Sequence, residues 1–387
     1  MSRYPDRSYA EIMEDLEVFG PIKVGVLGWC GPDMQNGVPR AISMAVNEAL
    51  AKGLITRKVE FIYREEDGLS PGLAQNSVDG YNWLCDQGCL MIIGPHSNPN
   101  IASVMEASEK RKVPFVSMNG AAKGTGKYAF RLGNGEAGGE DALIINWLEK
   151  KGYKNVGILV EVVEEDGYEQ FEFFQFEARK RGINIRAVEY ANHTPKNLPE
   201  QLERIRGTNP DALVFLGMGY NFMMGNLPSA LEDLNWDIPK ICNASFMFYP
   251  VDHFALDGWV GVDQYCPGNP VAEAFKKKYE ALYGEELGLD PNSEWCDGLY
   301  CLAYDFGQVI AETIFRAPEL STIGMVRGLE RIRWLPAATG GIGTHIDCSN
   351  YEHNMFSGDW LVLGRIENGE LKYEGKYEPI PDAEIHF

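Results

Sequence analysis

The sequence predicts an α/β protein with two similar units, each a parallel sheet flanked by helices. Short apolar segments of strand length alternate with amphipathic segments of helical period from residue 22 to residue 242. This alternation is typical of βαβ units, in which a helix connects each strand to the next parallel strand. The series occurs twice, and a chain of 387 residues is long enough for two or three domains.

In the first unit the expected helices have recognisable signals. Apolar residues at helical spacing occupy 38–49, and Ser70 followed by Pro71 is a favourable N-cap with proline at the first helical position. Asn98 and Pro99 provide a similar start. The expected strands are 23–27, 59–63, 89–93 and 113–118.

The second unit repeats this order and is followed by further elements. Its expected strands are 156–160, 183–190, 212–216 and 240–242, separated by helices near 138–151, 168–181, 197–207 and 223–234. Two long amphipathic helices follow, at about 270–283 and 294–316. The chain closes in an expected hairpin, with strands at 360–365 and 371–377 around the turn signal Asn368-Gly369.

The charge of the chain excludes several classes of partner. Lysine and arginine total 35 against 56 aspartate and glutamate residues, so the formal net charge is −21. A nucleic-acid surface requires a basic patch and anionic lipid attracts basic segments, so we expect neither nucleic-acid binding nor docking on a membrane surface. No uninterrupted apolar run approaches the ~18 residues of a spanning helix, so no membrane insertion is expected.

The N-terminal residues and the cysteines bear on the compartment. A secretory leader has a basic start and an apolar core, whereas residues 1–20 carry five acidic residues between scattered apolar ones. Eight cysteines spread over a chain of this length are typical of reduced thiols rather than of a disulfide framework. We therefore expect a cytoplasmic protein as the sequence stands, or a periplasmic one if a leader was removed.

Motifs of enzymes and metal sites are weak or missing in the sequence. Gly25, Gly28 and Gly31 follow the first strand with GxxGxxG spacing, which differs from the GxGxxG of dinucleotide sites and is better explained by a turn. The histidines form no HExxH motif, the cysteines form no CxxC pair, and no GxSxG elbow occurs. We expect no metal, no cofactor and no enzymatic activity.

Two strand ends in the first unit carry small polar residues that suit a ligand. The 94–99 loop contains His96 and Ser97 and leads into a helix start, whose amides favour a carboxylate or similar anion. Asn98 explains the same helix start equally well as a simple N-cap. Because the next strand ends in a similar loop, 117–122, the two ends together favour a ligand cradle.

An acidic block follows the first strand of the second unit. The 161–177 segment carries seven carboxylates and no basic residue. Apolar residues at helical spacing make most of these acids the solvated side of a helix. Glu165 and Asp166 are exceptions, because they lie in the loop after a strand, where ligand sites of α/β proteins form.

Several segments together resemble the motifs of one protein family. These segments are Ile92-Ile93-Gly94-Pro95 with Ser97-Asn98, Val113-Pro114-Phe115-Val116-Ser117, Phe130-Arg131, Ala303-Tyr304-Asp305, and Gly341-Ile342-Gly343 with Asp347. In order and spacing they resemble type I periplasmic binding proteins, in the branch that binds branched-chain amino acids and amides. The resemblance covers residues 22 to 377.

The resemblance implies two Rossmann-like lobes, with parallel sheets flanked by helices, joined by three crossover segments with the ligand cleft between the lobes. We place the crossovers near Arg131, Tyr265 and Asn354. Lobe 1 then comprises 22–131 plus 267–354, lobe 2 comprises 132–266 plus 355–387, and 1–21 is an N-terminal extension. Ligand binding in such a protein closes the lobes about a hinge.

The resemblance also implies positions for ligand-binding residues. Ser97 or Asn98 stands where the family holds a ligand carboxylate, and Asn119 and Ala121 stand in the next loop. The acidic residue that would meet an ammonium group falls near Ser245, where this sequence has no acid.

Aromatic and acidic residues complete the expected site. Glu165, Asp166 or Tyr168 stands after the first strand of lobe 2, and Tyr304 matches a helical tyrosine that faces the cleft. The full expected set is Trp29, His96, Ser97, Asn98, Asn119, Gly120, Ala121, Glu165, Asp166, Tyr168, Tyr220, Asn221, Ser245, Phe246 and Tyr304.

These features predict a solute-binding protein that captures a small molecule by hinge closure and delivers it to an ABC importer. Its expected partners are a small-molecule ligand and an ABC permease. The ligand stays open among an amino acid, an amide, a carboxylate and an aromatic acid. The alternative is a cytoplasmic ligand-sensing regulator on the same fold, and an NAD-linked enzyme is a more distant one.

Overall fold

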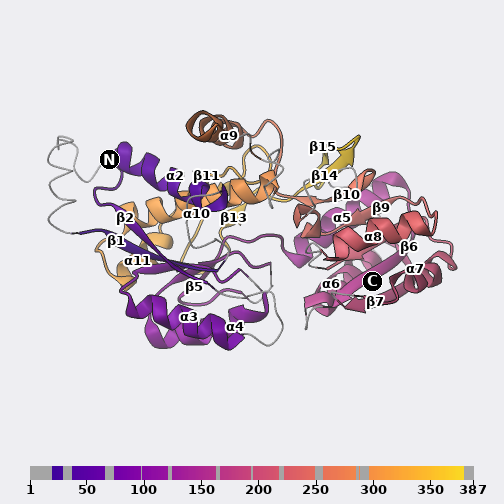
Figure 1. The fold of residues 1–387 in the computed structure, drawn as a ribbon, viewed down its shortest axis with the longest axis horizontal. Coiled ribbons are helices and arrows are strands. Elements are labelled where there is room, and N and C mark those ends of the chain that lie inside the picture. Colours follow the sequence, from indigo (N-terminus) through magenta and orange to yellow (C-terminus); the bar gives the residue numbers. More distant parts are fainter. Residues whose placement is uncertain are drawn as a thin grey trace.

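The structure is a computed structural model of the chain. It describes residues 20–28, 37–65, 74–96, 98–120, 124–162, 166–192, 195–217, 222–248, 256–284, 287 and 296–378. Figure 1 shows two α/β bodies side by side, with the chain passing between them near the middle of the molecule. The prediction of two α/β units is confirmed, and we call the bodies lobe 1 and lobe 2.

The sheet of lobe 1 has five strands in the order β2-β1-β3-β4-β5, and every neighbouring pair is parallel. Successive side chains point to opposite faces of the sheet. Ile92 accordingly packs in one apolar cluster and Ile93 in another. The strands are β1 (Ile22–Leu27), β2 (Val59–Arg64), β3 (Met91–Ile93), β4 (Phe115–Ser117) and β5 (Ala129–Arg131).

Helices cover both faces of this sheet (Figure 1). One face carries α3 and α4, and the other carries α2 and α10. A Cβ atom at Gly307 of α10 would lie 2.3 Å from the backbone oxygen of Ile42, so glycine allows α10 to pack closely on α2. The helices of lobe 1 are α2 (Gly37–Ala51), α3 (Ala74–Asp86), α4 (Asn98–Arg111), α9 (Pro270–Tyr283), α10 (Asp297–Arg316) and α11 (Thr322–Leu329).

The sheet of lobe 2 has seven strands in the order β15-β14-β10-β9-β8-β6-β7. The strands from β10 to β7 are parallel, and β14 and β15 form an antiparallel hairpin beside β10. Asn368 and Gly369 turn this hairpin with φ values of 53° and 73°, as the sequence predicts. The strands are β6 (Asn155–Val162), β7 (Asn184–Asn192), β8 (Ala212–Leu216), β9 (Lys240–Cys242), β10 (Trp259–Asp263), β14 (Val362–Glu367) and β15 (Glu370–Gly375).

The helices of lobe 2 connect these strands in the expected order. Helix α5 contacts α6, and helix α7 contacts α8. A short 3-10 helix, η1, follows β9. The bounds are α5 (Ala137–Lys151), α6 (Asp166–Lys180), α7 (Leu198–Arg206), α8 (Phe222–Asp233) and η1 (Ala244–Phe248).

Within the described residues the chain passes between the two sheets three times. The first crossing runs from β5 to α5 through 132–136, and the second runs from β10 to α9 through 264–269. A small antiparallel sheet, formed by β11 (Leu335–Pro336), β12 (His345–Ile346) and β13 (Phe356–Ser357), precedes the third crossing at 358–361.

Some elements differ from the sequence-based expectation. Strands β5 and β10 and the small sheet β11-β12-β13 are additions to the expected set. The expected helix at 294–316 is α10, which begins at Asp297. The expected start at Ser70 and Pro71 lies outside the described residues.

The described cysteines are unpaired, and all except the half-buried Cys85 are buried. Burial raises the pKa of the Cys89 thiol to about 12, so this thiol is inert packing at neutral pH. In the described part of the chain, no helix combines the length and apolar character that a membrane span requires.

Candidate functional site

The expected ligand cradle of lobe 1 lies at the carboxyl ends of β3 and β4. Gly94 follows β3 with a φ of 95°, and a Cβ atom there would lie 2.3 Å from the backbone oxygen of Leu27. Only glycine suits this conformation and approach, so the turn after β3 is fixed by packing against β1. His96 is half-buried in the same turn, and Asn98 is the first residue of α4.

The loop after β4 packs against the first crossing. A Cβ atom at Gly120 would lie 3.0 Å from the backbone oxygen of Asn134. Asn119 is buried, and its side-chain amide donates to the Ser117 hydroxyl at 2.5 Å. A Cβ atom at Gly124 would lie 2.3 Å from the Asn119 amide oxygen, so this side chain is enclosed by its own loop. Asn119 therefore shapes the loop, and Gly120 brings it close to the first crossing.

In lobe 2, three strand ends are held together by side chains that the sequence analysis passed over. Asn243 follows β9, and its side-chain oxygen accepts hydrogen bonds from the backbone amides of Gly217 at 3.3 Å and Ser245 at 3.4 Å. Glu161 is buried near the end of β6, and a Cβ atom at Gly217 would lie 2.7 Å from its carboxylate. The sequence signal for Glu161 is a charged residue within an apolar strand. The signal for Asn243 is a polar residue directly after a strand.

A buried carboxylate joins α5 to this corner. The Glu140 carboxylate accepts a hydrogen bond from the backbone amide of Ala244 at 2.7 Å. Burial raises the pKa of Glu140 to about 7. Its neighbour Asp141 is also buried, and burial raises the pKa of that carboxyl well above its usual range although Gln170 donates to it at 2.9 Å.

The Phe130-Arg131 pair lies where lobe 1 gives way to the first crossing. Phe130 stacks on His353, with ring centroids 4.0 Å apart. The backbone amide of Arg131 donates to the backbone oxygen of His353 at 2.8 Å, and the Arg131 guanidinium forms a 2.9 Å ion pair with Glu136 at the start of α5. The pair therefore ties the first crossing to the segment before β13.

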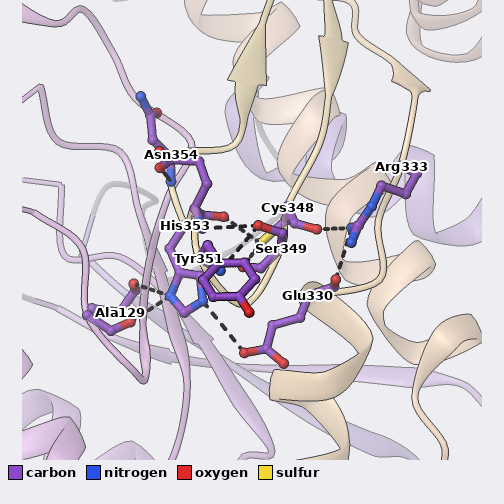
Figure 2. Close-up of polar contacts among 10 residues, drawn as sticks. Ala129, Glu330, Arg333, Cys348, Ser349, Tyr351, His353 and Asn354 are labelled. Atoms are coloured by element: carbon purple, nitrogen blue, oxygen red, sulfur yellow. Dashed lines mark hydrogen bonds and ion pairs between the residues drawn. The ribbon is translucent and has the colours of Figure 1, made fainter.

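His353 is fixed within this segment from three sides (Figure 2). Its Nδ1 atom lies 2.6 Å from the backbone oxygen of Gly126 and 3.3 Å from that of Ala129, and its Nε2 atom lies 3.7 Å from the Glu330 carboxylate. The ring therefore fastens the 353–355 segment to the edge of the lobe 1 sheet.

The expected site residue Phe246 lies in the packed interior of lobe 2. Phe246 is fully buried in η1, and a Cβ atom at Gly261 of β10 would lie 2.3 Å from its side chain. A Cβ atom at Gly364 of β14 would lie 2.9 Å from the same ring. Two glycines on adjacent strands thus leave space that the phenylalanine fills, which makes it a core residue.

The expected site residue Tyr304 packs between helices of lobe 1. Its ring stacks on Phe275 of α9 at a centroid distance of 4.6 Å, and its hydroxyl lies 3.5 Å from the Glu48 carboxylate of α2. Tyr304 therefore belongs to the contact between three helices of lobe 1. The next residue of the same motif, Asp305, is fully buried on α10.

The other expected residues are placed only in part. Tyr168 is half-exposed in the first turn of α6, with its ring 5.4 Å from that of Tyr190 on the edge strand β7. Ser245 is buried in η1. The positions of Trp29, Ser97, Ala121, Glu165, Tyr220 and Asn221, and the side chains of Asn98 and Asp166, lie outside the described residues.

A profile of the periplasmic binding protein family matches residues 21–361. The chain belongs to this family. The match spans both lobes and all three crossings, and it agrees with the family that the sequence motifs resemble. A search of curated proteins by sequence gives no match.

Solved structures of periplasmic binding proteins share the fold at low sequence identity. A leucine-binding protein from Thermotoga maritima has a TM-score of 0.72 at 20% identity, covering 92% of this chain and 99% of its own. A branched-chain amino acid transporter substrate-binding protein from Streptococcus pneumoniae, in complex with isoleucine, has a TM-score of 0.73 at 18% identity, covering 93% and 100%. A solute-binding protein of an ABC transporter from R. palustris, in complex with 4-hydroxybenzoate, has a TM-score of 0.74 at 17% identity, covering 94% and 98%.

Membership of this binding-protein family supports the expectation of a non-enzymatic protein. Among the residues that the structure places, no group of three or more histidine, cysteine, aspartate or glutamate side chains could hold a metal ion.

The position of Tyr304 leads to a first prediction. We expect Tyr304→Phe to leave ligand binding unchanged, because the ring packs on α9 and the hydroxyl faces Glu48 of α2. The loss of its long 3.5 Å contacts with Glu48 should cost less than about 1 kcal/mol of unfolding free energy. The rise in Tm on addition of ligand, compared between the variant and the wild type, measures the effect on binding. If the variant shows no rise in Tm, Tyr304 contacts the ligand.

Proposed function

We propose that the protein is the solute-binding component of an ABC importer and captures a small molecule between its two lobes. The observation that carries this proposal is that the carboxyl end of β5 in one sheet and that of β10 in the other come together. The first crossing leaves the end of β5, the second leaves the end of β10, and Gln264 after β10 is hydrogen-bonded to Gly133 and Gly135 after β5. Ligands of open α/β sheets bind at such ends, where loops present polar groups.

A small carboxylic acid is the ligand class that we propose. The molecules named in two of the related structures, isoleucine and 4-hydroxybenzoate, both carry a carboxylate. In this chain the turn after β3 leads directly into α4, whose first amides suit a carboxylate. The residues that we propose for the site are Trp29, His96, Ser97, Asn98, Asn119, Gly120, Ala121, Glu165, Asp166, Tyr168, Tyr220, Asn221 and Ser245.

Thermal unfolding with candidate acids tests the binding function. We expect leucine, isoleucine, valine or 4-hydroxybenzoate to raise the Tm by several degrees, since a ligand at about 100 times its Kd stabilises a protein by about 2.7 kcal/mol. The methyl ester of an active acid is the matched control and should have little effect, because it lacks the charge. If amino acids, amides and aromatic acids all leave the Tm unchanged at millimolar concentration, the proposed ligand class is wrong.

An ABC permease is the proposed membrane partner. The lobe limits stated in the sequence analysis also stay a proposal. The comparisons give no support to a ligand-sensing regulator or to an NAD-linked enzyme. Uptake of the labelled ligand into proteoliposomes that contain a candidate ABC permease tests the partnership. Uptake should require this protein, and uptake of equal rate without it would contradict the proposal.

A further inference from the structure

A buried glutamine on the second crossing is hydrogen-bonded to the first crossing and is linked through one turn to the third. Gln264 is the first residue after β10 and is fully buried. Its side-chain oxygen accepts from the backbone amide of Gly135 at 3.1 Å, and its side-chain nitrogen donates to the backbone oxygen of Gly133 at 3.0 Å. Both glycines lie on the first crossing.

The backbone of Gln264 reaches the third crossing through one intermediate turn. Its carbonyl oxygen accepts from the backbone amide of Gly340 at 2.6 Å. The adjacent Gly341 donates to the backbone oxygen of Asp359 on the third crossing at 2.8 Å. A Cβ atom at Gly340 would lie 2.4 Å from Cα of Trp360, so this turn lies directly against the third crossing.

Asp263 holds Gln264 in this position. Its carboxylate accepts from the backbone amides of Gln264 at 2.6 Å and Tyr265 at 3.0 Å. The backbone around Gln264 is therefore fixed, and the side chain is aimed at the first crossing.

We infer that Gln264 is a positioning residue that couples the three crossings, so that they bend as one unit when the lobes open and close. This inference rests on the proposed function, because closure is what captures the ligand. Hinge motion in two-lobed proteins is concentrated in a few residues that link rigid bodies. A glutamine suits this place because its amide both donates and accepts, so one side chain satisfies two buried backbone groups of the same crossing.

The inter-lobe distance distribution of the ligand-free protein tests the coupling and needs no known ligand. Spin labels at Glu109→Cys on α4 and Glu172→Cys on α6 report on lobe 1 and lobe 2, and both positions are exposed. We expect Gln264→Met, which keeps the volume but removes both side-chain hydrogen bonds, to broaden the distribution. A distribution with the wild-type width would overturn the inference.

A matched control separates coupling from general loss of stability. Gln201 on α7 is also a buried glutamine, and its side-chain nitrogen donates to the backbone oxygen of Tyr190 at 2.6 Å within lobe 2. Gln201→Met should lower the Tm but leave the inter-lobe distribution unchanged. If Gln201→Met broadens the distribution as much as Gln264→Met does, Gln264 has only a structural role.

Hydrogen exchange of the wild type provides a measurement that does not depend on a variant folding. The amides of Gly135 and Gly340 should have the same opening equilibrium, because Gln264 accepts both. In Gln264→Met, the protection of the Gly135 amide should fall about tenfold. Wild-type protection that differs by more than about tenfold between the two amides would show that the crossings open separately. Since none of these readouts involves ligand, failure of the proposed ligand class leaves them interpretable.

Discussion

Replacement of Asp305 by alanine is expected to lower the free energy of unfolding by about 3 kcal/mol, because it leaves two buried backbone amides without acceptors. Asp305 lies fully buried on α10, and its carboxylate accepts from the backbone amides of Ala338 at 2.8 Å and Thr339 at 2.9 Å. It also accepts from the Gln308 side chain at 2.8 Å. These bonds fix the 338–339 segment immediately before Gly340, which contacts the second crossing. Urea unfolding followed by circular dichroism measures the change.

Asp305→Asn is the matched control for this prediction. The amide keeps one acceptor oxygen and nearly the same shape, so it should lose roughly half as much stability as alanine. A change below about 1 kcal/mol for Asp305→Ala would show that the 338–339 segment does not depend on this carboxylate.

The second prediction concerns pH: the protein should be more stable at pH 5.5 than at pH 8, by about 2 kcal/mol or more. Burial raises the pKa of Asp263 and of Glu140 to about 7 each, from ordinary values near 4. Between these values the folded state holds protons that the unfolded state has released. Stability is therefore present at the acidic end of this window and is lost as the pH rises through 7. Urea midpoints across this range measure the effect.

The double variant Asp263→Asn/Glu140→Gln should reduce this pH dependence, because it removes two of the groups that titrate in this window. Part of the dependence should stay, because burial also raises the pKa of Asp305 to about 6 and that of Asp141 well above its usual range. Carboxylates with lowered pKa values, such as Asp211 and Glu374, change stability in the opposite direction. They titrate below about pH 4, which is outside the range compared here. A wild-type protein whose stability rises from pH 5.5 to pH 8 would contradict the burial of these two carboxyls.

The fold was predictable because apolar periodicity marks long elements well. The strands and helices of both units follow from alternating apolar segments, whereas β5 is only three residues long and carries too little pattern to be recognised. Strand β10 contains Gly261 and ends in Asp263, two features that resemble a loop. Its glycine is explained only by Phe246, which fills the space beside it.

The candidate site was predictable only to the level of strand ends. The turn after β3 and the loop after β4 could be located because ligand sites follow parallel strands. The direction of an aromatic side chain could not be predicted from the sequence. Tyr304, for example, packs on α2 and α9, which are separate elements of the chain. Gln264 belongs to no recognisable motif. Its role appears only in the structure, where it is hydrogen-bonded to the 133–135 segment and to Gly340.

Small-angle X-ray scattering of the wild-type protein, with and without a saturating acid that raises its Tm, tests the central claim most directly. Capture between two lobes requires the bodies in Figure 1 to approach each other, so the radius of gyration should decrease when the acid is added and stay unchanged with its methyl ester. An acid that binds tightly without changing the radius of gyration would contradict capture by closure about the three crossings.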